Sequence, residues 1–271
     1  MIKDAGQGGF RSQLSPVGRE TVQDRVYSEL RRALIGGVFE SGQVLTVRGL
    51  ADALLTSTMP VREALGRLVV EKALEALPNR SVRIPPITIE RLDELLSVRI
   101  LIEGKAAELA TARMSRSEIE QLEHILSDWE ALRASKGELD VDREVRVNQS
   151  FHFAIYEACG SLTLLPIIES LWLQSGPCTR FAIQALSRLE EVDTDLFHRR
   201  IVESLRAKDA GKVREMLVAD MSRSFAFLRT KLESDSTRAE SSWQIAPSSS
   251  KSLDPSSASR RKERQPGFRT N

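Results

Sequence analysis

Residues 57–68 read STMPVREALGRL, and this stretch decides the fold expected for the N-terminal part of the chain. The hydroxyl residues Ser57 and Thr58 precede Pro60, which suits the first turn of a helix because it has no N–H group to satisfy. Apolar residues then recur at helical spacing and predict a helix from about Pro60 to Lys72. Its apolar face comprises Val61, Leu65, Leu68 and Val69.

Two further helices are expected before this one. The first has an apolar residue at every fourth position over residues 22–34 and ends at Gly36-Gly37, where glycine supplies a left-handed cap. The second is a short helix over residues 48–55. Two helices joined by a short turn, with the second beginning near Ser57, form a helix-turn-helix.

Two extended segments follow, at residues 73–77 and 81–84, and Pro78-Asn79-Arg80 separates them. In the second segment, apolar and polar residues alternate as in a half-buried strand. A two-stranded wing after three helices predicts a winged helix-turn-helix, a DNA-binding module, over residues 20–86. A generic small α+β bundle is the alternative.

The rest of the chain is predicted to be helical. Pro85-Pro86 forms a stiff connector, and residues 87–234 then show helical periodicity without any competing strand pattern. The fold class is therefore mainly α, with a C-terminal all-α bundle of six or seven helices. The predicted helices cover residues 89–114, 115–134, 140–158, 162–173, 179–189, 194–207 and 209–232.

The two ends of the chain have compositions unlike the rest. Residues 1–19 contain several glycines and little periodicity, which predicts a flexible arm, and residues 235–271 form a basic, Ser-rich tail that we expect to be disordered. The net charge of +1 for 271 residues hides opposing blocks, because residues 1–86 carry +3, residues 87–234 carry −5 and the tail carries +3. A basic N-terminal unit is compatible with a nucleic-acid partner.

Composition excludes several other classes of protein. Hydrophobic residues make up 41% of the chain and charged residues 28%, as in globular proteins, and no apolar run is long enough to span a membrane. The two cysteines, Cys159 and Cys178, cannot form a disulfide framework and are expected to fill the core. A cytoplasmic protein without a membrane partner is the expectation.

DNA contacts are expected from the second helix of the helix-turn-helix, which enters the major groove, and from basic residues around it. An alternative for Arg62 and Arg67 is that they are solvated charges that pair with Glu63 or Glu71. The candidate DNA-binding residues are Arg48, Ser57, Thr58, Met59, Arg62, Arg67, Asn79 and Arg80.

A second group of polar residues lies on the apolar faces of the predicted bundle helices. Asn148 and His152 are four residues apart and share one helix face, and His198 and Asp220 lie on later helices. If these side chains converge, their lone pairs can bind a divalent metal. The alternative is a set of ordinary packed or surface groups, as we expect for the exposed His124.

The N-terminal motif resembles the winged helix of GntR-type regulators over about residues 22–84. The likeness is carried by Leu50-Ala51-Asp52 and by the Pro-Val-Arg-Glu-Ala-Leu core that begins at Pro60. It implies that Arg48 and Arg62 contact DNA and that Ser57 contacts the DNA backbone. Thr58 departs from the pattern because many members carry arginine there, and Ser81 replaces the usual wing glycine.

The helical part resembles the FCD effector domain of the FadR branch. The likeness rests on Arg99-x-x-x-Glu103, Asn148-x-x-Phe151-His152, Phe197-His198 and Lys208-Asp209-Ala210 followed by Asp220. It implies a divalent metal, with zinc expected and nickel or manganese as alternatives. The implied ligands are Asn148, His152, His198 and Asp220, the last at a place where histidine is usual.

The same resemblance implies that a small organic acid binds in the helical domain. The implied effector-binding residues are Arg99, Asn148, His152 and His198. A guanidinium fits a carboxylate because its fork reaches both oxygens, although Arg99 has an alternative role as the ion-pair partner of Glu103.

We therefore expect a homodimeric, ligand-responsive transcription regulator that binds a palindromic or near-palindromic operator. Residues 87–234 would bind the effector and form the dimer. One alternative is a non-haem metal enzyme that uses His152, His198 and Asp220, and another is a helical adaptor without a small ligand.

Overall fold

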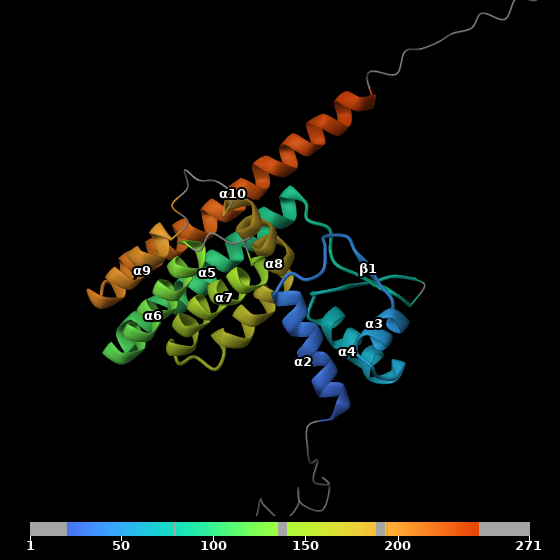
Figure 1. Cartoon of the computed structure of the whole chain (residues 1–271), viewed down its shortest axis with the longest axis horizontal. Coiled ribbons are helices and arrows are strands. Elements are labelled where there is room, and N and C mark those ends of the chain that lie inside the picture. The colour runs from blue at the N-terminus through green and yellow to red at the C-terminus, as the bar shows by residue number, and fades with distance from the viewer. Residues whose placement is uncertain (1–20, 79, 135–139, 188–192, 194, 244–271) are drawn as a thin grey trace, which may run out of the picture. The chain divides into compact units, whose positions relative to one another are not determined.

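The computed structural model describes residues 21–78, 80–134, 140–187, 193 and 195–243. The predicted arm at residues 1–19 and the tail from residue 244 onward lie outside these residues. Two compact units divide at Glu233 and Ser234. Figure 1 shows that the first unit contains a small N-terminal winged group and a larger group of helices.

The N-terminal group begins with α2 (Val22–Ile35). The Thr21 side chain accepts a hydrogen bond from the backbone N–H of Asp24, and Asp24 accepts one from the backbone of Thr21, so the helix starts with a capping box. It ends at Gly36, and Gly37 adopts the left-handed conformation with φ 61°. The predicted glycine cap of this helix is confirmed.

The helix-turn-helix consists of α3 (Val47–Ala53) and α4 (Thr58–Val70). Thr46 caps α3 through its side chain, whereas Ser57 stands at the N-cap of α4 without a side-chain capping bond. The buried face of α4 carries most of the predicted apolar residues, because Val61, Leu65 and Leu68 are at most 3% exposed. The helix predicted from the STMPVREALGRL stretch is confirmed.

The wing contains one more strand than the sequence predicted. Strands β1 (Val44–Leu45), β2 (Glu75–Ala76) and β3 (Val82–Arg83) form an antiparallel sheet in the order β1-β3-β2. Val44 and Glu75 both pair with Arg83 from opposite sides. Strand β1 has only two residues, too few to show an alternation of apolar and polar side chains in the sequence. It is recognised as a strand by its pairing with β3.

Six helices of the described chain form the C-terminal bundle, in agreement with the predicted all-α class. They are α5 (Ile89–Arg113), α6 (Arg116–Ala134), α7 (Val141–Ala158), α8 (Leu164–Leu186), α9 (Leu196–Arg206) and α10 (Ala210–Trp243). The predicted capping box at Ser115 and Glu118 is present at the start of α6.

The predicted break between residues 173 and 179 is wrong, because α8 is one continuous helix that contains Pro177. A proline removes one helical hydrogen bond and usually ends or kinks a helix. Here α8 packs against α2, α5 and α7, and Gly176 lets the backbone of α2 approach closely at Leu34. Tertiary packing outweighs the local signal of Gly176-Pro177.

The predicted end of the last helix at Leu232 is also wrong, since α10 continues to Trp243. The predicted disordered tail therefore begins with a helical segment. Residues 233–243 contain neither proline nor glycine, so no strong helix breaker occurs before Pro247.

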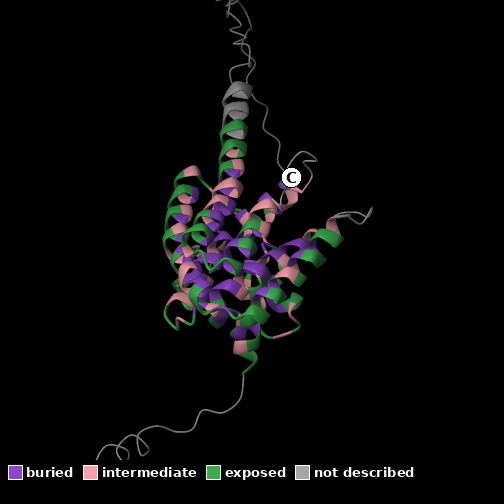
Figure 2. Cartoon of the chain, turned by 90° about the vertical axis from the view of Figure 1, so that its left-hand side faces the viewer, coloured by how far each residue is buried: buried purple, intermediate pink, exposed green. Residues whose placement is uncertain are grey.

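Figure 2 shows the buried residues on the faces that the helices turn toward one another, with exposed residues on the outer faces. The largest fully buried side chains include Trp129, Phe151 and Tyr156, all in the bundle. Among the described residues, no helix is both long enough and apolar enough to span a membrane.

Candidate metal centre and DNA interface

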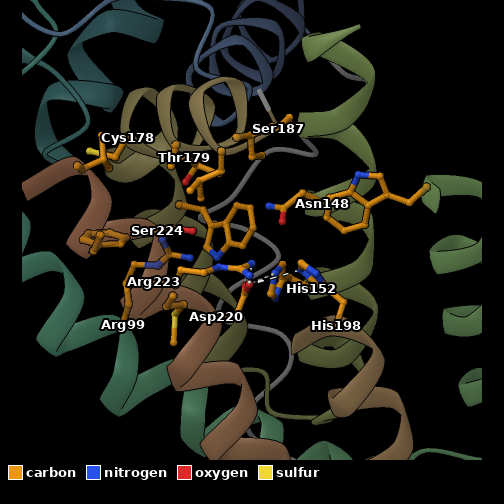
Figure 3. Close-up of a pocket in the computed structure, with 18 of the residues that line it drawn as sticks. Arg99, Asn148, His152, Cys178, Thr179, Ser187, His198, Asp220, Arg223 and Ser224 are labelled. Carbon is orange, nitrogen blue, oxygen red and sulfur yellow. Dashed lines mark hydrogen bonds and ion pairs between the residues drawn. The ribbon is translucent and has the colours of Figure 1, made fainter. Parts of the chain in front are cut away.

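Three helices bring His152, His198 and Asp220 together inside the bundle. The Asp220 Oδ2 atom lies 3.5 Å from His152 Nε2 and 3.7 Å from His198 Nε2. One potential ligand atom from each residue lies within 4.8 Å of the other two. Figure 3 shows Asp220 on α10 pointing toward the His152 ring on α7 and the His198 ring on α9.

Aromatic packing holds the two imidazole rings in place. The His198 ring lies 4.7 Å from the ring of Trp129 and 4.9 Å from that of Phe151, centroid to centroid. The His152 ring lies 5.7 Å from Trp172. Both histidines are only 3% exposed, so the rings are enclosed by protein.

Burial also keeps His198 neutral. Loss of hydration lowers the pKa of His198 from its ordinary value of 6.5 to about 4, against the opposing attraction of Asp220. Neither ring nitrogen of His198 has a hydrogen-bond partner among the described residues. A buried neutral imidazole with two unsatisfied nitrogens is suited to metal ligation.

The carboxylate of Asp220 stays ionised despite its burial. Burial alone would raise its pKa, but the His198 and His152 rings and the nearby Arg223 guanidinium together lower the pKa below its ordinary value. The Arg223 Nη2 atom lies 3.3 Å from Asp220 Oδ1. Since Arg223 interacts with Oδ1, the Oδ2 atom of Asp220 is the oxygen that faces the two histidines.

These donors fit a divalent metal ion. Two imidazole nitrogens and a carboxylate oxygen are typical ligands of zinc and also of nickel and manganese. Asn148 lies one turn before His152 on α7, is buried, and lines the same cavity. Its amide oxygen is of the type that can complete such a ligand set.

The four predicted metal ligands line a cavity of about 60 Å³. Ser187 Oγ, which lies above Asn148 in the view of Figure 3, is buried without a hydrogen-bond partner among the described residues. The cavity thus combines positive charge, hydroxyl groups and aromatic rings. Its polar lining includes Arg99, Arg133, Thr179, Ser187, Arg223 and Ser224.

Arg99 lines this cavity, but its guanidinium is bound within the protein. Its Nε and Nη2 atoms donate to the two carboxylate oxygens of Glu103, at 2.5 and 3.1 Å, and Nη1 donates to Ser175 at 3.3 Å. The ion pair anticipated as an alternative role is therefore present. An effector carboxylate would have to compete with Glu103 for the Arg99 fork.

Sequence reasoning missed several residues of this region. Tyr156 donates a hydrogen bond to Glu103 at 2.6 Å and lies 3.5 Å from His152 Nδ1. Its burial and the neighbouring Glu103 carboxylate raise its pKa well above the ordinary value. A signal was available, because Asn148, His152 and Tyr156 follow one another at four-residue spacing on α7.

Two arginines at the cavity were also missed. Arg133 is bound by the fully buried Glu144 at 2.7 Å and also by Asp195. Arg223 donates to the backbone oxygen of Asp193 and to Asp220. Arg223 and Asp220 are three residues apart on α10, but the other pairs join different segments of the chain, so helical periodicity could not reveal them.

At the other end of the unit, the predicted DNA-binding residues of the helix-turn-helix lie at the surface. Arg48 on α3 and Met59 and Arg62 on α4 are exposed, as are Ser57 and Thr58 at the start of α4. Because Ser57 makes no capping bond, the first N–H groups of α4 keep their ability to bind a phosphate.

Arg67 and Arg80 differ from this group. The Arg67 guanidinium packs 3.6 Å from the Tyr27 ring centroid and forms an ion pair of 3.3 Å with Asp24. Glu63 and Glu71, the partners considered from the sequence, do not take part in this ion pair. Arg80 is exposed with a φ of 63°, and the neighbouring candidate Asn79 lies outside the described residues.

An exposed recognition helix on a winged module, joined to an all-helical domain, is the architecture of a class of DNA-binding regulators. The family described as bacterial regulatory proteins, gntR family, matches residues 22–84, and the FCD domain family matches residues 94–223. The chain belongs to the GntR family of transcriptional regulators and carries an FCD domain. It is a regulator and not an enzyme.

Individual relatives agree with this assignment. The HTH-type transcriptional regulator McbR of Escherichia coli (strain K12) is 29% identical over 204 residues, which span 75% of this chain and 91% of the relative. The gluconate operon transcriptional repressor of Bacillus subtilis (strain 168) is 27% identical over 218 residues, spanning 77% and 84%. The solved structure of E. coli McbR/YncC, 28% identical, has a TM-score of 0.72 and covers 79% of this chain and 99% of its own.

Proposed function

We propose that this regulator controls its operator through a small organic acid that binds at a divalent metal in the helical domain. The observation that carries the proposal is the convergence of His152, His198 and Asp220 beside a buried polar cavity. The protein would act in the cytoplasm as a homodimer on a palindromic or near-palindromic DNA site, since two-fold proteins bind two-fold operators.

His152, His198 and Asp220 would hold the ion, together with Asn148. Zinc is the expected metal, with nickel or manganese as alternatives, and the Asp220 carboxylate makes the ligand set harder and more anionic than an all-histidine set. A bound divalent ion supplies a Lewis-acidic positive charge that holds a carboxylate. The buried neutral state of His198 leaves its lone pair available for this purpose.

The effector is proposed to be small. The cavity of about 60 Å³ is well below the roughly 300–1,000 Å³ typical of pockets for drug-sized ligands. Asn148, His152 and His198 would contact the acid at its metal end, and Arg99 would contribute to the far wall. One relative is named for the gluconate operon, which is consistent with a small polar acid as the ligand class.

Operator binding is proposed to use Arg48, Ser57, Thr58, Met59 and Arg62 around the N-terminus of α4, with Arg80 and Asn79 from the wing. Arg67 is a further candidate, because its side chain is 51% exposed while its guanidinium packs against the Tyr27 ring. Effector binding would change DNA affinity by favouring one arrangement of the two DNA-binding modules in the dimer.

Metal analysis of purified protein tests the site. We expect stoichiometric divalent metal in the wild-type protein and almost none in the double variant His152→Ala plus His198→Ala, because two of the three converging ligands are removed. The variant His124→Ala is the matched control, since His124 is the third histidine of the chain and is exposed. Equal metal content in the double variant and the wild type would refute the assignment.

A thermal-shift screen of small carboxylates on the metal-loaded protein tests the effector class. A true ligand raises the unfolding temperature by mass action, by an amount that increases with concentration above its Kd. The same acids should give no shift in the His152→Ala plus His198→Ala variant. A shift that persists in that variant would place the ligand elsewhere.

A further inference from the structure

We propose that Tyr156 is a positioning residue for the metal site: its hydroxyl group connects the buried Glu103 carboxylate to the His152 ring and accepts the hydrogen on Nδ1 in the tautomer whose Nε2 lone pair binds the metal. The inference rests on the proposed metal site and deepens it. A series of buried hydrogen bonds connects α5 to α7, and the position of the hydrogen in each bond carries the inference.

The first group in this series of hydrogen bonds is the Glu103 carboxylate, which is 0% exposed. Besides the two donors of Arg99, this carboxylate accepts a hydrogen bond from the Tyr156 hydroxyl at 2.6 Å and one from Trp172 Nε1 at 3.2 Å. A carboxylate that is paired with arginine is ionised and acts only as an acceptor. In each of these hydrogen bonds, the group that faces Glu103 is therefore the donor.

The single hydroxyl proton of Tyr156 is thereby committed to Glu103. The contact between Tyr156 and Glu103, at 2.6 Å, is much shorter than the 3.5 Å between the Tyr156 oxygen and His152 Nδ1. Charge-assisted hydrogen bonds to carboxylates are the stronger ones, so the proton stays on the Glu103 side. The Tyr156 oxygen then faces His152 with a lone pair and can only accept.

This arrangement gives a hydrogen on His152 Nδ1 a fixed acceptor, which offsets the pull of the ionised Asp220 carboxylate on a hydrogen at Nε2. If Tyr156 accepts, His152 Nδ1 carries the hydrogen and Nε2 carries the lone pair. His152 Nε2 is the atom that faces Asp220 Oδ2 at 3.5 Å. Metal-bound histidines usually donate their other N–H to a fixed acceptor, which sets the tautomer and orients the ring.

Packing supports the same orientation. Tyr156 lies four residues after His152 on α7, and their rings stack with an interplanar angle of 25° and a centroid distance of 6.1 Å. Trp172 contacts both rings from α8 while donating to Glu103. Because the Arg99 and Glu103 charges offset each other, this support adds no net charge to the metal site.

The first test compares zinc affinity in Tyr156→Phe with the wild type by competition against a chelator. Removal of the hydroxyl keeps the ring packing but removes the acceptor for His152 Nδ1–H, and such a change typically weakens metal binding about 10–100-fold. The matched control is Tyr27→Phe, which makes the same change at the only other tyrosine, in the DNA-binding module. Circular dichroism should show native helix content in both variants.

The second test reads the tautomer directly and does not depend on metal. Nitrogen NMR of the metal-free protein in alkaline buffer, where imidazole is neutral, resolves the ring nitrogens, and only three histidines need to be assigned. Because Asp220 and Tyr156 offer acceptors to opposite ring nitrogens, we expect a population of the Nδ1–H form of His152 in the wild type and a smaller one in Tyr156→Phe. The exposed His124 serves as an internal reference.

The outcomes separate this proposal from the metal site itself. Wild-type zinc affinity in Tyr156→Phe, with impaired binding in His152→Ala, would overturn the role of Tyr156 alone. Undiminished binding in His152→Ala would refute the metal site. The same His152 tautomer in the wild type and in Tyr156→Phe would overturn the proposed connection whether or not metal binds.

Discussion

At the scale of single residues, the environment of His198 differs most from that of an ordinary histidine. Its ring is enclosed by Trp129, Phe151 and His152, and both nitrogens lack hydrogen-bond partners among the described residues. Such a buried polar group has a cost for folding unless something satisfies it. The site is therefore organised for a ligand and not for stability of the metal-free protein.

This environment predicts acid sensitivity of the metal-free protein. The pKa of His198 is lowered from 6.5 to about 4, so between these values the unfolded state binds a proton that the folded state does not. Stability is present above pH 6.5 and is lost as the pH falls toward 4, by about 3 kcal/mol for this group at 1.36 kcal/mol per pKa unit. Urea unfolding in the presence of chelator, at several pH values, measures the effect.

The control is His198→Phe, which should flatten the pH dependence across this window because no titrating ring is left at the position. His124→Ala should retain the wild-type slope, since that histidine is exposed. An unchanged slope in His198→Phe would show that other groups dominate the acid sensitivity.

At the scale of helices, the close approach of α2 and α8 depends on the absence of a side chain at Gly176. A Cβ atom at this position would lie 1.8 Å from the backbone oxygen of Leu34, and one at Gly37 would lie 2.5 Å from the backbone oxygen of Gly176. Backbone atoms cannot move aside as a flexible side chain can. Glycine inside α8 is thus required by packing, although it disfavours a helix locally.

We accordingly expect Gly176→Ala to destabilise the protein by about 1–3 kcal/mol, the usual cost of overpacking, despite the better helix propensity of alanine. Gly66→Ala is the matched control, because a Cβ atom at that helical position meets nothing within 4 Å. The control should be more stable by up to about 1 kcal/mol. Chemical denaturation of both variants gives the comparison, and a stable Gly176→Ala would disprove the close contact.

At the scale of the whole molecule, the two matched domains, GntR over residues 22–84 and FCD over residues 94–223, occupy separate parts of the chain. The DNA-binding part carries a net charge of only +3 over residues 1–86. Because non-specific affinity depends on phosphate contacts, a module with few positive charges has little affinity of its own. This favours two modules acting together on one operator.

Arg62→Ala should therefore weaken operator binding by about 1–3 kcal/mol for each base that the guanidinium no longer reaches, and by more if both copies in a dimer contribute. Arg116→Ala is the control, since Arg116 is exposed on α6 and pairs there with Glu120. Fluorescence anisotropy with operator DNA at several salt concentrations measures both variants. Equal affinity of Arg62→Ala and the wild type would exclude this arginine from the interface.

Much of this architecture could be predicted from the sequence. The Pro60–Leu65 motif identified the recognition helix, and periodicity located the starts of all six bundle helices to within a few residues, although it divided α8 in two. Residues four apart, such as Asn148 and His152, share a face through helix geometry alone. Local patterns failed where packing dominated, at β1 and at Pro177 in α8, and they placed the end of α10 too early.

The sequence by itself determined which residues could bind DNA or a metal, because helix type and the choice of polar residues are local properties. Only the tertiary structure decided which of them meet. His198 and Asp220 converge on His152 because α9 and α10 pack beside α7. Contacts between distant segments depend on how whole helix faces bury together, and no local pattern encodes that.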